Sequence, residues 1–374
     1  PTSDHARRLS PRDDNGRVLH AFRVVEGGAN LEWVAELSAE PHTNEWLEPH
    51  PTNGRLYALA APDRTACLRL GPSGAPLSME TFAVGGGGAH MELSRDGRWA
   101  VISCYEAGEV EVLPIRPDAS LGPPVDSKVV ANGLFEYNPA LADRQDGAHP
   151  HQARLDPFAN RWCLVCDLGS DVVWVYRFDS ATGHLSGAST DARHLRLPEG
   201  AGPRHLDFHP SGKWVFVSCE LTGDIVVAEF DAEGSGTLTA VHSVYALPEG
   251  VPCSREGSRG NADIHCSQDG RFVFATTRTD HAIVTFGVDP ASGHLTLLSR
   301  CASGGLTPRH FQLDGEFLRV VNQDGTDGSE ATTGCVVTFR VAEDGALVEP
   351  RTVAVDGCPA MITQPVSPGA PQRM

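Results

Sequence analysis

One stretch of the sequence, GPRHLDFHPSGKWVFVSCELTGD, holds a cation, a titratable ring and a carboxylate at its two outer ends. Apolar and polar residues alternate on both sides of a Pro-Ser-Gly break, which is the pattern of a β-hairpin. A hairpin brings its two ends together, so we expect Arg204 and His205 to lie beside Glu220. Such groups can bind an anion, transfer a proton or stabilise the oxyanion of an attacked carbonyl.

The hairpin belongs to a unit that recurs along the chain. The unit is a short strand, a turn of the Asp-Gly-Arg kind, an apolar strand, a polar turn, a third strand and a looser fourth; clear copies begin at Leu93, Leu155, Phe208 and Cys266, and weaker ones at Pro49 and Leu313. The turns of successive copies stand 43 to 63 positions apart. Units of this length with four strands are typical of propeller blades. The sequence therefore predicts an all-β, seven-bladed β-propeller with four antiparallel strands per blade.

Six blades are visible as repeats, and the chain ends are expected to supply the seventh. The stretch RVLHAFRVVEGGANLEWVAELS near the N-terminus, joined by CPAMITQPV near the C-terminus, would close the ring. The predicted organisation is a flexible tail at 1–18, one propeller domain at 19–366 and a flexible tail at 367–374. A polar, proline-rich loop from Pro117 to Pro150 does not fit a blade, and loops of this length are usually functional or disordered.

The repeat also predicts where polar side chains gather. The first strand of a blade lines the channel and the second runs back beside it, so the starts of the first strands and the ends of the second strands share one face. Counting back eight residues from the basic residue of the turn places His90, His205 and Asp263 at this position. With a two-residue insertion or deletion allowed, His151 and His310 take the same position, which makes five consecutive copies. The second strands end at Tyr105, Asp167, Glu220, Arg278 and the 322–324 group. Expected partners are Arg204 with Glu220, Asp263 with Arg278, Arg309 with Asp324 and His151 with Asp167.

Unpaired charges beside a core are costly, so a polar ring at one mouth of the channel favours a binding or catalytic site. Each histidine taken alone has a structural interpretation of at least equal weight, because channels hold water and strand ends need polar partners. A metal site is the minority interpretation. His149 and His151 could ligate Zn, Mn or Fe with Asp263 or His205, but the positions lie in different blades and the intervening arginines would repel a cation. We predict no metal and no cofactor.

The remaining motifs narrow the chemistry. The sequence has no Ser-His-Asp elbow and no glycine-rich phosphate loop that follows a strand. A formal net charge of -18 argues against nucleic acid and anionic membranes as partners. No run is apolar enough to span a membrane and the N-terminal stretch has no apolar signal core. Ten cysteines, most of them within strand patterns, fit a reducing compartment, so we expect a cytoplasmic protein.

Four stretches resemble a known family: NPALADRQDGAHPHQARLDP, GAGPRHLDFHPSGKWVFVSCEL, ADIHCSQDGRFVFATTRTDHAIVTF and GLTPRHFQLDGEFLRVVNQDG. They occur in the order and at the spacing of the seven-bladed lactonase propellers, the bacterial 6-phosphogluconolactonase family, whose fold is shared by fungal carboxymuconate-cyclising enzymes. The resemblance runs from about Pro49 to about Val348. The sequence departs from the family before Ala21, at an insertion in the sixth blade and at Cys219, where the family often has asparagine.

The resemblance implies hydrolysis of a sugar lactone, first of all 6-phosphogluconolactone, without metal or organic cofactor. It assigns catalysis to His151, Arg204, Glu220 and Arg278. Arg144 and Gln145 match the loop motif of the family, and the expected substrate-binding residues are His90, Tyr105, Arg144, His149, His205, Asp263, Arg309 and His310. In the predicted mechanism Glu220 or His151 activates water, while Arg204 and Arg278 stabilise the oxyanion and hold an anionic substituent.

Three alternatives stay open at this point: a cycloisomerase for a carboxylated muconate, a lactonase for a non-phosphorylated sugar lactone and a non-enzymatic scaffold. The loop tips are mostly Gly, Asp, Ser and Thr, which counts against the scaffold. The expected partner is a small anionic sugar lactone, and the expected state is a monomer or weak dimer.

Overall fold

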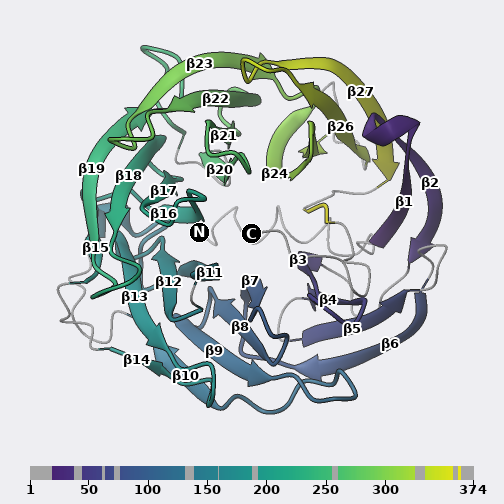
Figure 1. Cartoon of the computed structure of the whole chain (residues 1–374), viewed down its shortest axis with the longest axis vertical. Coiled ribbons are helices and arrows are strands. Elements are labelled where there is room, and N and C mark those ends of the chain that lie inside the picture. The colour runs from purple at the N-terminus through teal and green to yellow at the C-terminus, as the bar shows by residue number, and fades with distance from the viewer. Residues whose placement is uncertain are drawn as a thin grey trace, which may run out of the picture.

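The computed structural model describes residues 19–37, 44–60, 64–70, 76–130, 139–158, 160–187, 193–254, 260–324, 333–356 and 361–363. Their strands form sheets that are arranged like blades around a central axis (Figure 1). The chain is therefore an all-β propeller. The predicted tails at 1–18 and 367–374 lie outside the described residues. No described helix is long and apolar enough to cross a membrane.

Six sheets of the described part hold four or five strands, and each runs outward from the channel. The first is β3 (Asn44–Pro49), β4 (Arg55–Ala60), β5 (Arg64–Leu70) and β6 (Pro76–Ala83); the second is β7 (Gly88–Leu93), β8 (Trp99–Cys104), β9 (Glu109–Pro114) and β10 (Asp126–Val129). The third is β11 (Pro150–Leu155), β12 (Trp162–Asp167) and β13 (Val172–Phe178), whose outer edge pairs with β14 (Leu185–Ser186) and β15 (Leu195–Arg196). The fourth is β16 (Pro203–Phe208), β17 (Trp214–Cys219), β18 (Asp224–Phe230) and β19 (Leu238–Tyr245). The fifth is β20 (Asn261–Cys266), β21 (Phe272–Thr277), β22 (Ala282–Val288) and β23 (Leu295–Ala302); the sixth is β24 (Leu306–Asp314), β25 (Phe317–Asp324), β26 (Thr333–Val341) and β27 (Leu347–Asp356).

A smaller sheet stands where the seventh blade is predicted. It pairs β1 (Leu19–Val25) with β2 (Asn30–Leu37) around the short 3-10 helix η1 (Glu26–Gly28), and it lies between β27 and β6 (Figure 1). Leu31 packs against Val321 and Val336 of the sixth sheet. The predicted closure by C-terminal residues is described only at 361–363, which form no strand. These residues nevertheless join the two sides of the ring, because the backbone N of Leu47 lies 2.8 Å from Met361 Sδ and that of Ile362 lies 3.4 Å from His310 Nδ1.

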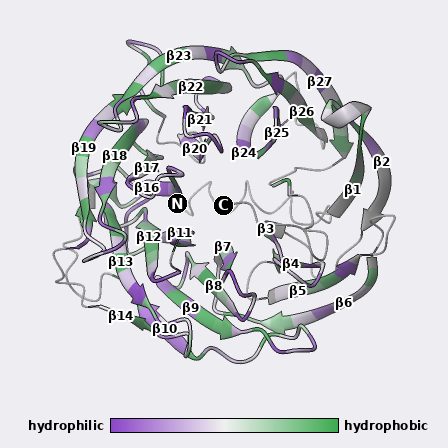
Figure 2. Ribbon diagram, viewed as in Figure 1, coloured by the Kyte–Doolittle hydropathy of each residue, from purple (hydrophilic) through white to green (hydrophobic). Residues whose placement is uncertain are grey.

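The hydrophobic cores lie between neighbouring sheets. Leu164 of the third sheet packs with Val217 of the fourth, and Phe216 of the fourth packs with Val273 of the fifth. In Figure 2 the middle strands β12 and β18 are largely green, whereas the turns between strands are largely purple. Burying both faces of the middle strands explains why they read as nearly continuous apolar runs.

Polar side chains of the inner strands join one blade to the next. Gln152 Oε1 accepts a hydrogen bond from the Leu206 N–H (2.7 Å), Asp207 from Cys266 (2.8 Å) and Asp263 from Phe311 (3.1 Å). Each acceptor lies on the inner strand of one blade and each donor on that of the following blade. These bonds hold the channel wall together.

All six inner strands share one irregularity. The register of each shifts near its start, between Asn44 and Trp46, Gly88 and His90, Pro150 and Gln152, Pro203 and His205, Asn261 and Ile264, and Pro308 and His310. Such a β-bulge interrupts the alternation of side chains and re-aims the residue it contains. His151, Arg204 and Arg309 are residues of this kind.

The predicted loop from Pro117 to Pro150 is partly a blade element. Its residues 126–129 form β10, the outer strand of the second sheet. The segment after the short 3-10 helix η2 (Pro139–Leu141) carries Arg144 toward the channel mouth. Residues 131–138 lie outside the described part of the chain.

Candidate active site

The predicted meeting of strand ends is confirmed at the channel mouth. The bulge of β16 carries Arg204, and Glu220 follows the last residue of β17. The Glu220 N–H donates to Gly202 O (2.7 Å), which fixes the carboxylate beside the start of the inner strand. In the next blade the Arg278 N–H donates to Gly260 O (3.2 Å), so Arg278 reaches the same mouth.

Glu220 lies at the centre of three arginines. Its Oε1 accepts from Arg144 (2.7 Å), and its Oε2 lies 2.8 Å from Arg204 Nε and 3.1 Å from an amino nitrogen of Arg278. The side chains of Glu220, Arg204 and Arg278 are at most 3% exposed, and that of Arg144 is 15% exposed. Burial alone would raise the pKa of Glu220, but the three guanidinium groups hold it well below its usual range.

Backbone carbonyls of the fifth blade fix two of these guanidinium groups. Arg204 donates to Ala262 O (2.9 Å), and Arg278 donates to Gly260 O and Asn261 O (3.0 Å each). Burial, with the nearby Arg278 charge, lowers the pKa of Arg204 to about 9, which leaves it protonated at neutral pH. The three arginines and one glutamate carry a formal charge of +2 in a chain of net charge -18.

His151 stands beside this cluster with a buried ring nitrogen, Nδ1, that has no hydrogen-bond partner in the described structure. Its ring contacts those of His205 and Tyr105, with centroids 5.1 and 5.7 Å away. Burial, and then the charge of Arg204, lower the pKa of His151 well below its ordinary value. The ring is therefore neutral at pH 7 and can accept a proton.

His205 has both ring nitrogens occupied. Its Nδ1 donates to Asp263 Oδ1 (2.7 Å), and its Nε2 accepts from Arg204 (3.1 Å). Burial and the Arg204 charge lower the pKa of His205 to about 3. This neutral ring thus orients Arg204 and is not free to act as a base.

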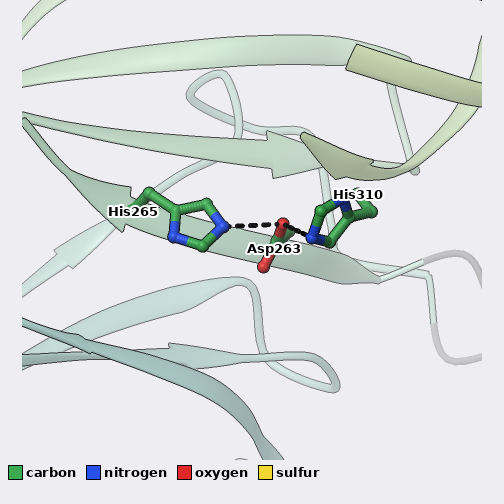
Figure 3. A group of neighbouring side chains, drawn as sticks. All are labelled: Asp263, His265 and His310. Atoms are coloured by element: carbon green, nitrogen blue, oxygen red, sulfur yellow. Dashed lines mark hydrogen bonds and ion pairs between the residues drawn. The ribbon is translucent and has the colours of Figure 1, made fainter. Parts of the chain in front are cut away.

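Asp263, His265 and His310 offer ligand atoms within 4.8 Å of one another, which is a possible metal-binding geometry (Figure 3). The donor set does not fit an ion, because hydrogen bonds already use these atoms. Asp263 accepts from His205, His265 and the backbone N–H groups of Ile264 and Phe311. His310 Nδ1 accepts from Ile362, which places the proton of the neutral ring on the Nε2 that faces Asp263 at 3.6 Å.

His265 differs from the other channel histidines in its protonation state. It lies between two carboxylates, 3.1 Å from Asp263 and 3.6 Å from Asp207. Burial would lower its pKa, but these charges raise it to about 10. His265 is therefore an imidazolium at neutral pH and neutralises part of the acidic channel wall.

Four aromatic rings from four blades meet across the channel below the arginines. The Trp46 ring lies 4.1 Å from that of His90, 5.4 Å from His310 and 5.8 Å from His205, and the last lies 6.2 Å from His90. We refer to these four rings as the floor of the site. Trp46 is not among the predicted site residues, because an apolar residue at a strand start does not differ in the sequence from a core residue.

The remaining predicted residues lie at the rim. Tyr105 stacks on His149 with ring centroids 4.5 Å apart, and His149 also pairs with Asp146 (2.6 Å). Tyr105 also shares a side-chain hydrogen bond with Arg144. Arg309 is half-buried, and its charge acts on His151, Arg204 and Arg278. Ten of the twelve predicted site residues thus fall into the Glu220 cluster, the floor and the rim. The other two are His151, which stands beside the cluster, and Asp263, which bonds to His205 and His265.

Two expected pairs are wrong, Asp263 with Arg278 and His151 with Asp167. Asp263 bonds to histidines, whereas Arg278 pairs with Glu220. Asp167 accepts from Ser170 and Trp174 and holds the His149 N–H (2.7 Å), so it supports the loop at the rim. The Arg204–Glu220 pair is confirmed, and Asp324 accepts from the Thr307 hydroxyl.

The register also corrects one aligned position. Pairing with the second strands places Gln152, and not His151, level with His90 and His205. The bulge adds one residue ahead of this position. His151 is therefore equivalent to Arg204, which explains why the two lie together at the mouth.

Fold and site define a β-propeller with a cationic cluster at one channel mouth. The family described as the lactonase seven-bladed β-propeller matches residues 10–352, and the chain belongs to this family. A 6-phosphogluconolactonase of Bacillus subtilis is 31% identical over 270 residues, covering 71% of this chain and 70% of that protein. One of Formosa agariphila is 24% identical over 355 residues, covering 91% and 94%. Among solved structures, a periplasmic gluconolactonase of Pseudomonas aeruginosa superposes with a TM-score of 0.78 at 26% identity, covering 92% of this chain and 94% of that one.

Proposed function

We propose that the protein is a lactone hydrolase that converts 6-phosphogluconolactone to 6-phosphogluconate. Membership of the lactonase family and the relatives named 6-phosphogluconolactonase support the reaction class. The single observation that carries the substrate is the gathering of Arg144, Arg204 and Arg278 on one carboxylate.

The charge of this cluster explains the choice of substrate. One glutamate cannot neutralise three guanidinium groups, and buried charge without a partner is unfavourable. A phosphate dianion supplies the missing negative charge, and arginine binds phosphate in bidentate geometry. The more exposed Arg144 is suited to the phosphate, whereas the deeply buried Arg204 and Arg278 are suited to the oxyanion.

In the proposed mechanism His151 takes a proton from water as the water oxygen attacks the lactone carbonyl carbon. Arg204 and Arg278 stabilise the tetrahedral oxyanion. The ring C–O bond then breaks, and the leaving alkoxide takes the proton back from His151. Glu220 is not the base, because both of its carboxylate oxygens are paired with guanidinium groups. It positions the arginines, and His205 with Asp263 orients Arg204 from below.

Hydrolysis of a non-phosphorylated lactone is the second candidate. The structural similarity to the periplasmic gluconolactonase of P. aeruginosa favours it. The two candidates differ in whether Arg144 has a charged group to bind.

We also propose the finer features that accompany this function. The β1–β2 sheet and the C-terminal segment would complete a seventh blade, since residues 361–363 already contact both sides of the gap. We propose a cytoplasmic location because the nine described cysteines are all free thiols. We also propose that the protein acts as a monomer or weak dimer.

The deciding experiment compares initial rates of ring opening on 6-phosphogluconolactone, glucono-δ-lactone and a carboxymuconolactone, each with and without a chelator. We expect the phosphorylated lactone to give the highest kcat/KM, unchanged by the chelator. A rate on this substrate equal to spontaneous hydrolysis would refute the proposal. Preference for glucono-δ-lactone would favour the second candidate, and activity on the muconolactone would favour cycloisomerase chemistry.

A further inference from the structure

Asp171 lies in the turn between β12 and β13, outside the set of residues predicted from the sequence. It is buried, and its backbone has a positive φ of 57°. Its two carboxylate oxygens accept three hydrogen bonds of 2.7 Å each, from the Gln145 side chain and from the N–H groups of Gly200 and Gly202. These donors come from two different loops, and each loop leads to the Glu220 cluster.

The first route runs through Gln145. Its amide nitrogen donates both to Asp171 and to Leu168 O (2.8 Å), which anchors the loop to the end of β12. The adjacent residue is Arg144, whose guanidinium binds Glu220 Oε1 (2.7 Å). The position of Arg144 over the carboxylate therefore depends on this anchor.

The second route runs through residues 200–202. Gly202 O accepts the Glu220 N–H (2.7 Å), and Ala201 O accepts that of Leu221 (3.1 Å). Gly202 has a φ of 62°, and a Cβ at this position would lie 2.5 Å from Leu221 Cγ, so the loop and the strand end fit closely. The same loop continues directly into Arg204.

We propose that Asp171 is a positioning residue for the active site. By holding both loops, it fixes the position of Arg144 relative to the Glu220 backbone. It acts through the two loops rather than on substrate. This inference rests on the proposed lactonase function for its kinetic consequences. Displacements of about 1 Å at a site can lower the rate about 100-fold.

The test uses Asp171→Asn, which keeps the shape but replaces one acceptor oxygen by a donor. Gln145→Ala removes only the Arg144 route. Asp231→Asn is the matched control, because Asp231 also accepts backbone N–H groups, those of Gly234 (3.2 Å) and Ser235 (2.8 Å), in an exposed turn. We expect Asp171→Asn to lower kcat and raise KM, with kcat/KM reduced about 10- to 100-fold. Gln145→Ala should mainly raise KM, and Asp231→Asn should match the wild type.

Two readouts do not require activity. Hydrogen exchange at the amides of residues 200–202 and 220–221 should accelerate in Asp171→Asn and stay unchanged in Asp231→Asn. The Kd for inorganic phosphate, measured by calorimetry, should rise at least several-fold in Asp171→Asn. Unchanged exchange and phosphate affinity in Asp171→Asn would overturn the inference. If the wild type opens no lactone, the proposed function fails, and these two readouts still decide the role of Asp171.

Discussion

Arg204, in the bulge of β16, and Glu220, one residue beyond β17, form a buried ion pair with Nε and Oε2 2.8 Å apart. Arg144 and Arg278 complete the ring of cations around the same carboxylate. The three guanidinium groups would repel one another, and the Glu220 carboxylate offsets this repulsion.

Replacing this carboxylate should therefore damage both activity and stability. Glu220→Gln leaves three buried guanidinium groups without their common partner, and breaking a buried pair in this way costs about 3–5 kcal/mol. We expect that loss in urea unfolding, together with a fall in kcat/KM of about 100-fold or more. Glu229→Gln is the control, because Glu229 is an exposed glutamate 3.8 Å from Lys213. Equal stability of the two variants would contradict the central role of Glu220.

Removing one oxyanion donor should affect turnover more than binding. Arg204→Ala is expected to lower kcat about 100- to 1,000-fold, as loss of a single oxyanion-hole donor does in other hydrolases. Arg161→Ala is the matched variant, since Arg161 also donates to a backbone carbonyl, that of Glu233 (2.9 Å), but through an exposed hydrogen bond in the turn between β11 and β12. Steady-state kinetics on the phosphorylated lactone give the comparison. An Arg204→Ala enzyme with wild-type kcat would show that the oxyanion lies elsewhere.

The pH profile should reflect the lowered pKa of His151. A base with an ordinary histidine pKa loses half its activity near pH 6.5, whereas His151 stays deprotonated to well below that value. We expect kcat/KM to stay level from pH 8 to pH 6 and His151→Asn to lower it at least about 100-fold. Glucono-δ-lactone is the substrate for this measurement, because a phosphate group itself titrates near pH 6. A half-maximal rate near pH 6.5 in the wild type would argue against His151 as the base.

Arg144 should determine preference for the phosphorylated substrate. It is the most exposed arginine on Glu220. Arg144→Ala is therefore expected to lower kcat/KM at least about 10-fold more for 6-phosphogluconolactone than for glucono-δ-lactone, since a charge-assisted pair with phosphate contributes about 1.5–3 kcal/mol. Equal losses on both lactones would place the phosphate on another group.

His265 should stabilise the fold most strongly below neutral pH. Its pKa is raised from 6.5 to about 10 in the folded state, so its contribution is fully present below pH 6.5 and is lost as the pH rises toward 10. One pKa unit corresponds to about 1.4 kcal/mol, so the contribution is at most about 5 kcal/mol. We expect the wild type to exceed His265→Gln in unfolding free energy at pH 6 and the difference to shrink steadily by pH 10. A difference that does not vary with pH would show that His265 is not charged in the folded protein.

The hairpins, and the face of the propeller at which their open ends lie, could be predicted from the sequence. Alternation around the Pro210-Ser211-Gly212 break predicts the β16–β17 pair, and from it the meeting of Arg204 with Glu220, because strand pairing follows from local pattern. The bulges were not predictable in this way. A bulge changes the register by one residue without changing the alternation on either side. The sequence pattern therefore aligns His151 with His205 and pairs Asp263 with Arg278, and the structure shows neither.

Residues that act through backbone geometry also escaped prediction. Asp171 and Asp167 resemble ordinary turn aspartates in the sequence, and only the approach of distant loops gives their carboxylates further donors. Trp46 is of a residue type that usually lies in a core. Only the structure shows that its ring contacts three histidines from other blades.

The aromatic floor has a kinetic consequence. Because rings of Trp46, His90, His205 and His310 come from four blades and lie against one another, we expect them to close one end of the site. The product would then leave by the route through which the substrate enters. A molecule that still occupies this passage excludes the next one. Accumulated sugar acid should therefore slow the enzyme as a purely competitive inhibitor, which couples the rate to the removal of product by the reaction that follows.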